Sequence, residues 1–191
     1  SPALASVETD GRRAAGIDDP VVRTFDETAL CRSPSNLFTI FTRAFTFSLP
    51  PSCSAMSLST LVDQMRPVLL FNAALSHHRQ GIRNGDSISL ASAQYFYNLS
   101  ITEIQRLAFC AGPVPTLNVL LMASYNNLGH LHSHNCDGLG SYVYHKCLHA
   151  AVLATNCSVF LTEEEYVFFV TTLMLTTTGS SHLASAAWFE R

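Results

Sequence analysis

The feature that most constrains the fold is an internal echo between two helical stretches. "LFNAALSHH" at Leu70–His78 aligns with "YNNLGHLHS" at Tyr125–Ser133, so that Asn72 pairs with Asn127. A helix breaker and a second amphipathic segment follow each copy. Helix–turn–helix units in a repeated order are typical of α-solenoids, in which each unit buries its apolar face against its neighbours. The echo therefore predicts an all-α array of antiparallel helix–turn–helix units.

Hydrophobic periodicity predicts five helical segments. Apolar stripes at helical spacing mark the first four segments, and "TEEE" at residues 162–165 is a capping box that opens the fifth. Gly81 is expected to end the first helix, and "RNGD" at residues 83–86 is expected to form the following loop. The expected helices cover residues 59–81, 89–109, 117–134, 139–153 and 162–175.

The two ends of the chain differ in composition from this helical region. Residues 1–34 show no helical or strand period and are expected to form a poorly ordered tail. "NLFTIFTRAFTFSLPP", from Asn36, is rich in aromatic and β-branched residues and predicts an extended apolar arm, assigned to residues 35–55, that lies on the helical body. The helical domain is then expected at residues 56–176 and a C-terminal tail at residues 177–191.

Composition narrows the classes of function. The net charge of −3 comes without a basic stripe, which argues against nucleic-acid binding. Apolar runs fall short of the ~20 residues that span a bilayer, so no membrane partner is expected. Charged residues are only 13% of the chain, and a surface so poor in charge suits contact with a partner. Because there is no CxxC pair and no signal-peptide pattern, we expect a soluble, cytoplasmic protein.

The stretch "SYNNLGHLH" resembles the first helix of a tetratricopeptide (TPR) unit, whose core reads large-x-x-Leu-Gly-x-x-aromatic. Tyr125, Leu128, Gly129 and His132 hold those positions here, and the earlier unit has Leu70, Ala73, Ala74 and His77. The wider pattern, residues 38–175, is similar to uncharacterised TPR-like proteins of diatoms. The resemblance implies two recognisable units, with the arm and the fifth segment capping the stack. It implies a binding role and no chemistry.

Carried over position by position, the resemblance implies a groove lined by the first helix of each unit. Asn72 and Asn127 stand where TPR proteins often place an Asn that holds a peptide backbone or carboxylate. The alternative is that both amides only tie neighbouring helices together. The Lys and Arg companions of a carboxylate clamp are absent, so the expected ligand is an apolar or mixed peptide or a helix. The expected groove residues are Phe71, Asn72, Leu75, His78, Asn126, Asn127, His130, Ser133 and His134.

The histidines support an alternative function, a His/Cys metal-binding helical protein. His130 and His134 lie one helical turn apart, and His145 and His149 repeat this spacing, with Cys136 and Cys147 nearby. Neither a CxxC nor an HExxH motif is present, which argues against this alternative. We therefore expect neither a metal site nor a cofactor.

No catalytic constellation assembles in the sequence. A nucleophile elbow, a Gly-rich phosphate loop and a pair of acid–base carboxylates are all missing, so no enzymatic activity is expected. The sequence predicts a non-catalytic protein–protein interaction module for an unidentified protein or peptide. Self-association through the arm or through missing repeats remains open as a further alternative.

Overall fold

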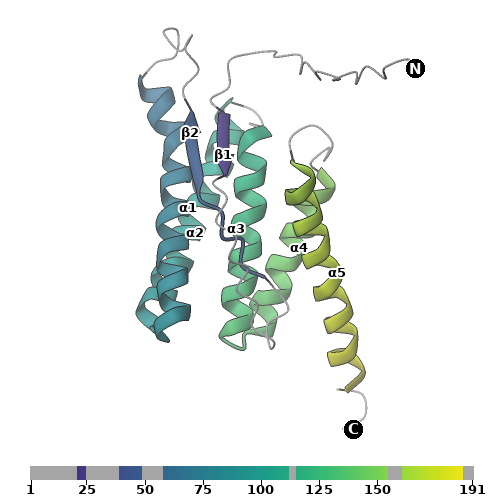
Figure 1. The fold of residues 1–191 in the computed structure, drawn as a ribbon. Helices are drawn as coiled ribbons and strands as arrows, with labels where there is room; N and C mark the ends of the chain where they lie inside the picture. The colour runs from purple at the N-terminus through teal and green to yellow at the C-terminus, as the bar shows by residue number, and fades with distance from the viewer. Residues whose placement is uncertain (1–20, 25–38, 49–57, 112–114, 155–160, 187–191) are drawn as a thin grey trace, which may run out of the picture.

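The structure is a computed structural model that describes residues 21–24, 39–48, 58–111, 115–154 and 161–186. Helices dominate these residues, which confirms the predicted helical class (Figure 1). One antiparallel ladder of two short strands accompanies them, with Val22 opposite Phe47. In chain order the elements are β1 (Val21–Thr24), β2 (Phe45–Ser48), α1 (Leu58–Asn84), α2 (Ser87–Ala111), α3 (Pro115–His134), α4 (Gly138–Ala154) and α5 (Glu163–Ala186).

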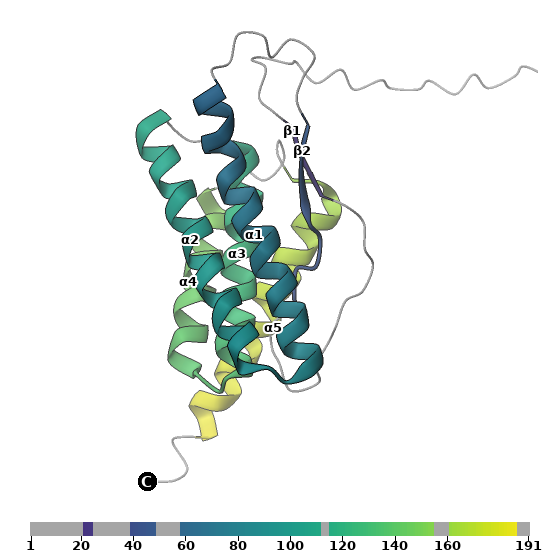
Figure 2. The same ribbon diagram turned by 90° about the vertical axis from the view of Figure 1, so that its left-hand side faces the viewer.

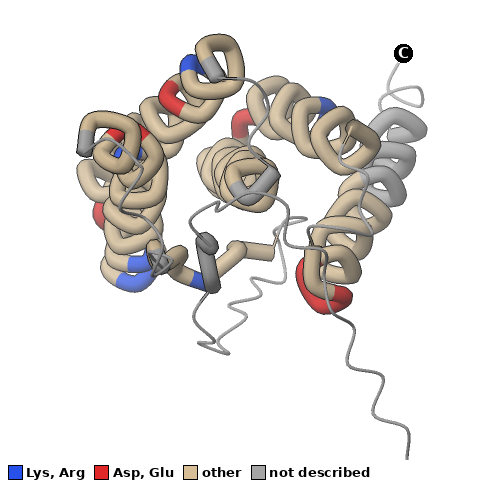
Figure 3. The backbone as a smooth tube through the Cα atoms, turned by 90° about the horizontal axis from the view of Figure 1, so that it is seen from above, with Lys and Arg blue, Asp and Glu red and all other residues tan. Residues whose placement is uncertain are grey.

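The helices pack in sequential pairs. Helix α1 packs most extensively against α2, and α3 against α4, while α2 joins the two pairs and α5 lies along α4. Seen from above, α1, α3 and α5 face one side of the molecule and α2 and α4 lie behind them (Figure 3). The two strands lie on the α1, α3 and α5 side, in front of the helices (Figures 1 and 2). We call residues 39–48 the arm.

The end of α1 lies beyond the predicted position. Gly81 is inside the helix, and Gly85, with a φ of 65°, follows its last residue. A Cβ atom at Gly81 would lie 2.5 Å from Cδ2 of Leu90, so this glycine lets α2 approach α1 closely. The prediction that Gly81 ends the helix was therefore wrong, and Asp86, which accepts the N–H of Ile88 at 3.0 Å, caps the start of α2.

The fifth helix begins where its capping box predicts. The N–H of Thr162 donates to Oε2 of Glu165 at 3.0 Å, and the N–H of Glu165 donates to Oγ1 of Thr162 at 3.2 Å. The helix does not end near Leu175 as expected but continues to Ala186. Strand β1 likewise lies within the segment expected to be a tail. Residues 1–20, 25–38, 49–57 and 187–191, which hold much of the predicted tails and arm, lie outside the described residues.

A single apolar cluster joins the arm to all five helices. Phe41 and Phe45 of the arm belong to it. The largest fully buried apolar side chains are Tyr97, Phe71, Phe169, Leu120, Met122, Leu128, Leu131 and Leu148. The arm is therefore packed as core, and it lies on the helical body as the sequence predicts. None of the helices in the described part of the chain holds a stretch long and apolar enough to cross a membrane.

Candidate functional site

Two asparagine side chains hold the arm by its backbone. Asn72 of α1 accepts the N–H of Phe45 on Oδ1 at 3.0 Å and donates from Nδ2 to the Phe45 carbonyl at 2.7 Å. Asn127 of α3 does the same for Phe41, with distances of 2.7 Å to the N–H and 3.0 Å to the carbonyl. We call these two contacts the asparagine clamps. Each one satisfies both backbone hydrogen-bonding groups of one arm residue, so the clamps bind main chain and not side chain.

A third asparagine completes the polar floor under the arm. Asn126 is fully buried and donates from Nδ2 to the carbonyl of Thr39 at 2.7 Å and to Oδ1 of Asn127 at 3.2 Å. Its own Oδ1 is buried and has no hydrogen-bond partner among the residues that the structure describes. A buried acceptor without a partner costs about 1–3 kcal/mol, so this oxygen is an unusual feature of the site.

Helix α5 contributes an aromatic wall. Phe41 stacks on Phe169, with ring centroids 5.5 Å apart and an interplanar angle of 10°, and meets Phe168 edge-on at 5.4 Å. Phe45 meets Phe71 of α1 edge-on at 5.0 Å and stacks on Phe41 at 5.8 Å. These offset-stacked and edge-to-face arrangements are those that aromatic quadrupoles favour. The side chains of the arm thus pack against α1 and α5, and its backbone is hydrogen-bonded to α1 and α3.

One ion pair lies at the edge of this contact. Nη2 of Arg43 lies 2.6 Å from Oε2 of Glu164, in the first turn of α5. The Glu164 side chain is 75% exposed and that of Arg43 is 24% exposed. Because water screens such a pair, we expect it to orient the arm on α5 more than to stabilise the fold.

Behind Asn127 a hydrogen-bonded network runs through three buried side chains. Nδ2 of Asn127 donates to the hydroxyl oxygen of Tyr97 at 2.9 Å, and this hydroxyl also lies 3.3 Å from Nδ1 of His78. Nε2 of His78 lies 3.1 Å from Nδ1 of His130, so one of these two nitrogens donates to the other. These contacts link the backbone of Phe41 to the imidazole of His130 through Asn127, Tyr97 and His78.

Burial keeps the network uncharged. Burial is also the main reason that the pKa of His78 lies well below its ordinary value, and the neighbouring His130 and His134 lower it further. The pKa of His130 falls to about 4, again through burial first and His134 second. Burial raises the pKa of the Tyr97 hydroxyl. At neutral pH all three side chains are therefore neutral.

The three histidines of α3, His130, His132 and His134, lie in different environments. His130 points to His78 and is buried, whereas Nδ1 of His132 lies 2.7 Å from Oδ2 of Asp137 in the turn before α4. His134 is exposed, and its ring stacks on that of His130 with centroids 6.3 Å apart. The alternating row is thus explained by helix geometry, as the predicted period implies.

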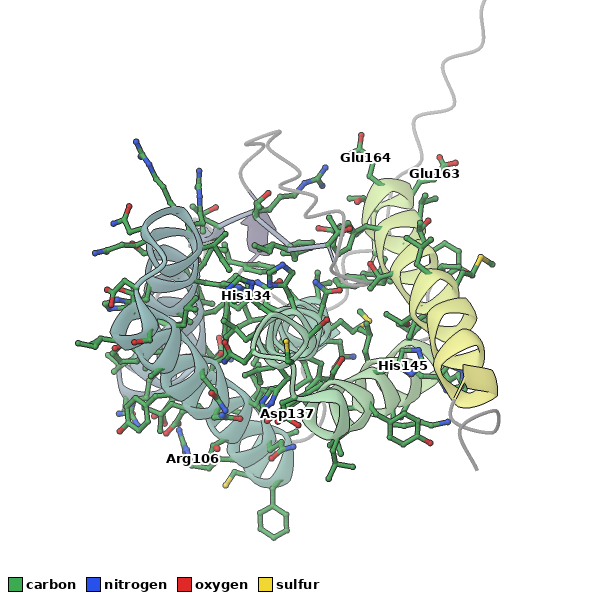
Figure 4. All side chains as sticks on the ribbon, turned by 90° about the horizontal axis from the view of Figure 1, so that it is seen from below. Arg106, His134, Asp137, His145, Glu163 and Glu164 are labelled. Carbon is green, nitrogen blue, oxygen red and sulfur yellow. The ribbon has the colours of Figure 1, made fainter. Side chains whose placement is uncertain are left out.

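The residues considered as metal ligands are separated in the fold. His134 lies on the α1 side of α3, while His145 lies between α4 and α5 (Figure 4). Cys136, with a φ of 59°, is exposed in the turn between α3 and α4. Within the described ranges, no three or more His, Cys, Asp or Glu side chains come together as a metal site would require.

The predicted groove residues divide into three groups. Phe71, Asn72, Asn126 and Asn127 contact the arm, and His78 and His130 stand behind Asn127 in the network. Leu75 is buried in the apolar cluster, whereas Ser133 is half-buried and His134 exposed. The site also includes four residues that the expected groove does not contain, namely Tyr97, Phe168, Phe169 and Glu164. The pair "FF" directly after the capping box was the signal that could have revealed the aromatic wall.

Comparisons with protein-family models, with curated proteins and with solved structures find no match to this chain. The resemblance of residues 38–175 to TPR-like proteins of diatoms therefore stays a prediction. The contacts of the arm with α1, α3 and α5 are the evidence from which a function is inferred.

Proposed function

We propose that this protein is a non-catalytic binding module whose groove, lined by α1, α3 and α5, receives a non-helical polypeptide segment. In the structure the chain's own arm lies against these three helices. The observation that carries the proposal is the pair of asparagine clamps on Phe41 and Phe45. Every residue other than proline offers the N–H and C=O that a clamp requires, so the clamps suit a segment supplied by another protein as well as by this one.

The placement of the clamps supports this proposal. Asn72 and Asn127 hold corresponding positions in the two echoing helices, and their side chains bond arm residues four positions apart. A repeated helix that presents the same amide to successive parts of one segment is the expected design of a peptide-binding array.

The alternative is that the arm is a permanent part of the core and that the asparagines only satisfy its backbone. The two cases differ in whether the arm can leave while the helices stay folded. A protease site introduced among residues 49–57 allows the full chain to be cut after folding, so that the arm stays in place without a covalent link. A fluorescent peptide spanning residues 21–48, with Cys31→Ser, is then offered to cut and uncut protein.

We expect the labelled peptide to enter the groove of the cut protein readily and that of the uncut protein only at higher peptide concentrations, because the tethered arm competes at a high effective concentration. Fluorescence anisotropy reports entry, and circular dichroism reports the helices. Asn127→Ala should weaken entry by about tenfold or more because it leaves two backbone groups of Phe41 without partners. Asn84→Ala, at the exposed end of α1, is the matched control. Loss of helical signal when the arm departs, or no entry of the peptide, would contradict the proposal.

A further inference from the structure

We infer that the groove selects its partner by the pattern aromatic-x-Arg-x-aromatic, and that the partner is a non-helical segment of another protein with this pattern. The chain's own Phe41, Arg43 and Phe45 are then an internal occupant that the partner displaces. This inference rests on the proposed function and adds side-chain selection to it. Clamps that bond only main chain confer no sequence preference, so selection must come from the side chains of the occupant.

The first aromatic position is defined by α5. Phe41 is 3% exposed and lies flat against Phe169, with Phe168 at its edge. The adjoining Asn127 clamp fixes the backbone of this same residue. A ring at this position therefore replaces water on two faces, whereas a smaller side chain would leave a void against Phe169.

The second aromatic position is defined by α1. Phe45 is 2% exposed, meets the edge of Phe71, and is held by the clamp of Asn72. Each clamp and each ring site acts on the same residue of the arm. The spacing of four residues between Phe41 and Phe45 is therefore set both by the clamps and by the ring sites. A segment with its rings three or five residues apart cannot fill both ring sites while both clamps are made.

The residue midway between the rings faces an acidic helix end. Arg43 pairs with Glu164, and Glu163 stands beside Glu164 in the first turn of α5 (Figure 4). An anionic side chain at this position would meet like charge, whereas a guanidinium is attracted to it. Thr42 and Ala44, which are half-buried and small, leave the two intervening positions open in the pattern.

The test uses the cut full-length protein and a panel of labelled peptides spanning residues 21–48. Phe41→Ala and Phe45→Ala in the peptide should each weaken entry by about tenfold or more, as expected of buried aromatic anchors. Arg43→Glu should weaken it roughly threefold to tenfold, as expected of a partly exposed charge. Glu164→Arg in the cut protein should recover the binding of the Arg43→Glu peptide. Glu163→Arg, an equal change of charge in the same helical turn, should recover less of it.

The outcomes separate this inference from the function on which it rests. If the native peptide enters and all three altered peptides enter equally well, the groove reads main chain only and the inference is wrong, while the proposed function stands. If charge reversal at residue 164 gives no more recovery than at residue 163, the role given to Glu164 is overturned. If the native peptide does not enter, the proposed function itself fails.

Discussion

Asn127 binds both backbone hydrogen-bonding groups of Phe41, a residue 86 positions earlier in the chain, at 2.7 Å and 3.0 Å. One side chain thereby joins the arm to the centre of the helical body. Its remaining amide hydrogen reaches Tyr97, so the same residue also joins the arm to the buried histidines.

Replacing Asn127 with Ala should therefore destabilise the protein strongly. The change leaves the N–H and carbonyl of Phe41 buried without partners, and each unpaired group costs about 1–3 kcal/mol. We expect the free energy of unfolding to fall by about 3 kcal/mol in urea titrations. Asn84→Ala should change it by no more than about 0.5 kcal/mol, as is usual for exposed sites. Equal effects of the two changes would show that the clamp is unimportant for stability.

The buried histidines predict a loss of stability in acid. Because the folded pKa of His130 is about 4 and that of His78 is also lowered, the unfolded chain, with histidine pKa values near 6.5, binds more protons below that pH. The stabilising effect of neutral His130 is complete above about pH 6.5 and is lost as the pH falls toward 4, and the lowered pKa of His78 acts in the same direction.

The measurement is the urea midpoint between pH 7.5 and 5, above the range in which the carboxylates titrate. His130→Gln removes one titrating group and should flatten the profile, whereas Asn84→Ala, at the exposed end of α1, should leave its slope unchanged. A profile as steep in His130→Gln as in the native protein would contradict the assignment.

Gly81→Ala should be destabilising although alanine favours helices. The added Cβ would lie 2.5 Å from Cδ2 and 3.0 Å from the backbone nitrogen of Leu90, so α1 and α2 would have to separate. Overpacking of this kind costs about 1–3 kcal/mol, which outweighs the gain of about 1 kcal/mol in helix propensity. Gly138→Ala, where a Cβ meets nothing within 4 Å, is the control. Thermal melting decides the matter, and a rise in midpoint for Gly81→Ala would show that the close approach has no role.

Phe169→Ala should remove the wall on which Phe41 lies. Truncation of a buried phenyl ring typically costs about 3–5 kcal/mol. Phe109, on α2, is 93% exposed and provides a chemically identical change outside the core. We expect a large fall in the urea midpoint for Phe169→Ala and almost none for Phe109→Ala, and similar values would mean that the aromatic wall contributes little.

Much of the helical framework could be predicted, because amphipathic periods and caps are local signals. The capping box at Thr162 is made as predicted. Gly81 and Gly85 could not be ranked as helix ends, since the choice depends on the approach of Leu90 from another helix. The extension of α5 beyond Leu175 could not be predicted either, because a run of threonines does not favour a helix. In the structure the hydroxyl of Thr176 donates to the carbonyl of Thr172 at 2.9 Å within the helix.

The site was predictable only on its helical side. The echo placed Asn72 and Asn127 at matching positions, and the composition of the arm indicated that it must lie on something apolar. That the arm lies across these two amides is a contact between distant parts of the chain, for which a single sequence has no local signal. The same holds for Tyr97, whose role depends on three helices meeting.

Native-state hydrogen exchange at the amides of Phe41 and Phe45 distinguishes a displaceable arm from a permanent part of the core. These N–H groups are protected by the clamps, so they exchange only when the arm leaves Asn72 and Asn127. If the groove is a binding site with a displaceable occupant, both amides should open at a clearly smaller free energy than the amides in the middle of α1 and α3. If they exchange only with global unfolding, the arm is an inseparable part of the core and the proposed groove does not exist.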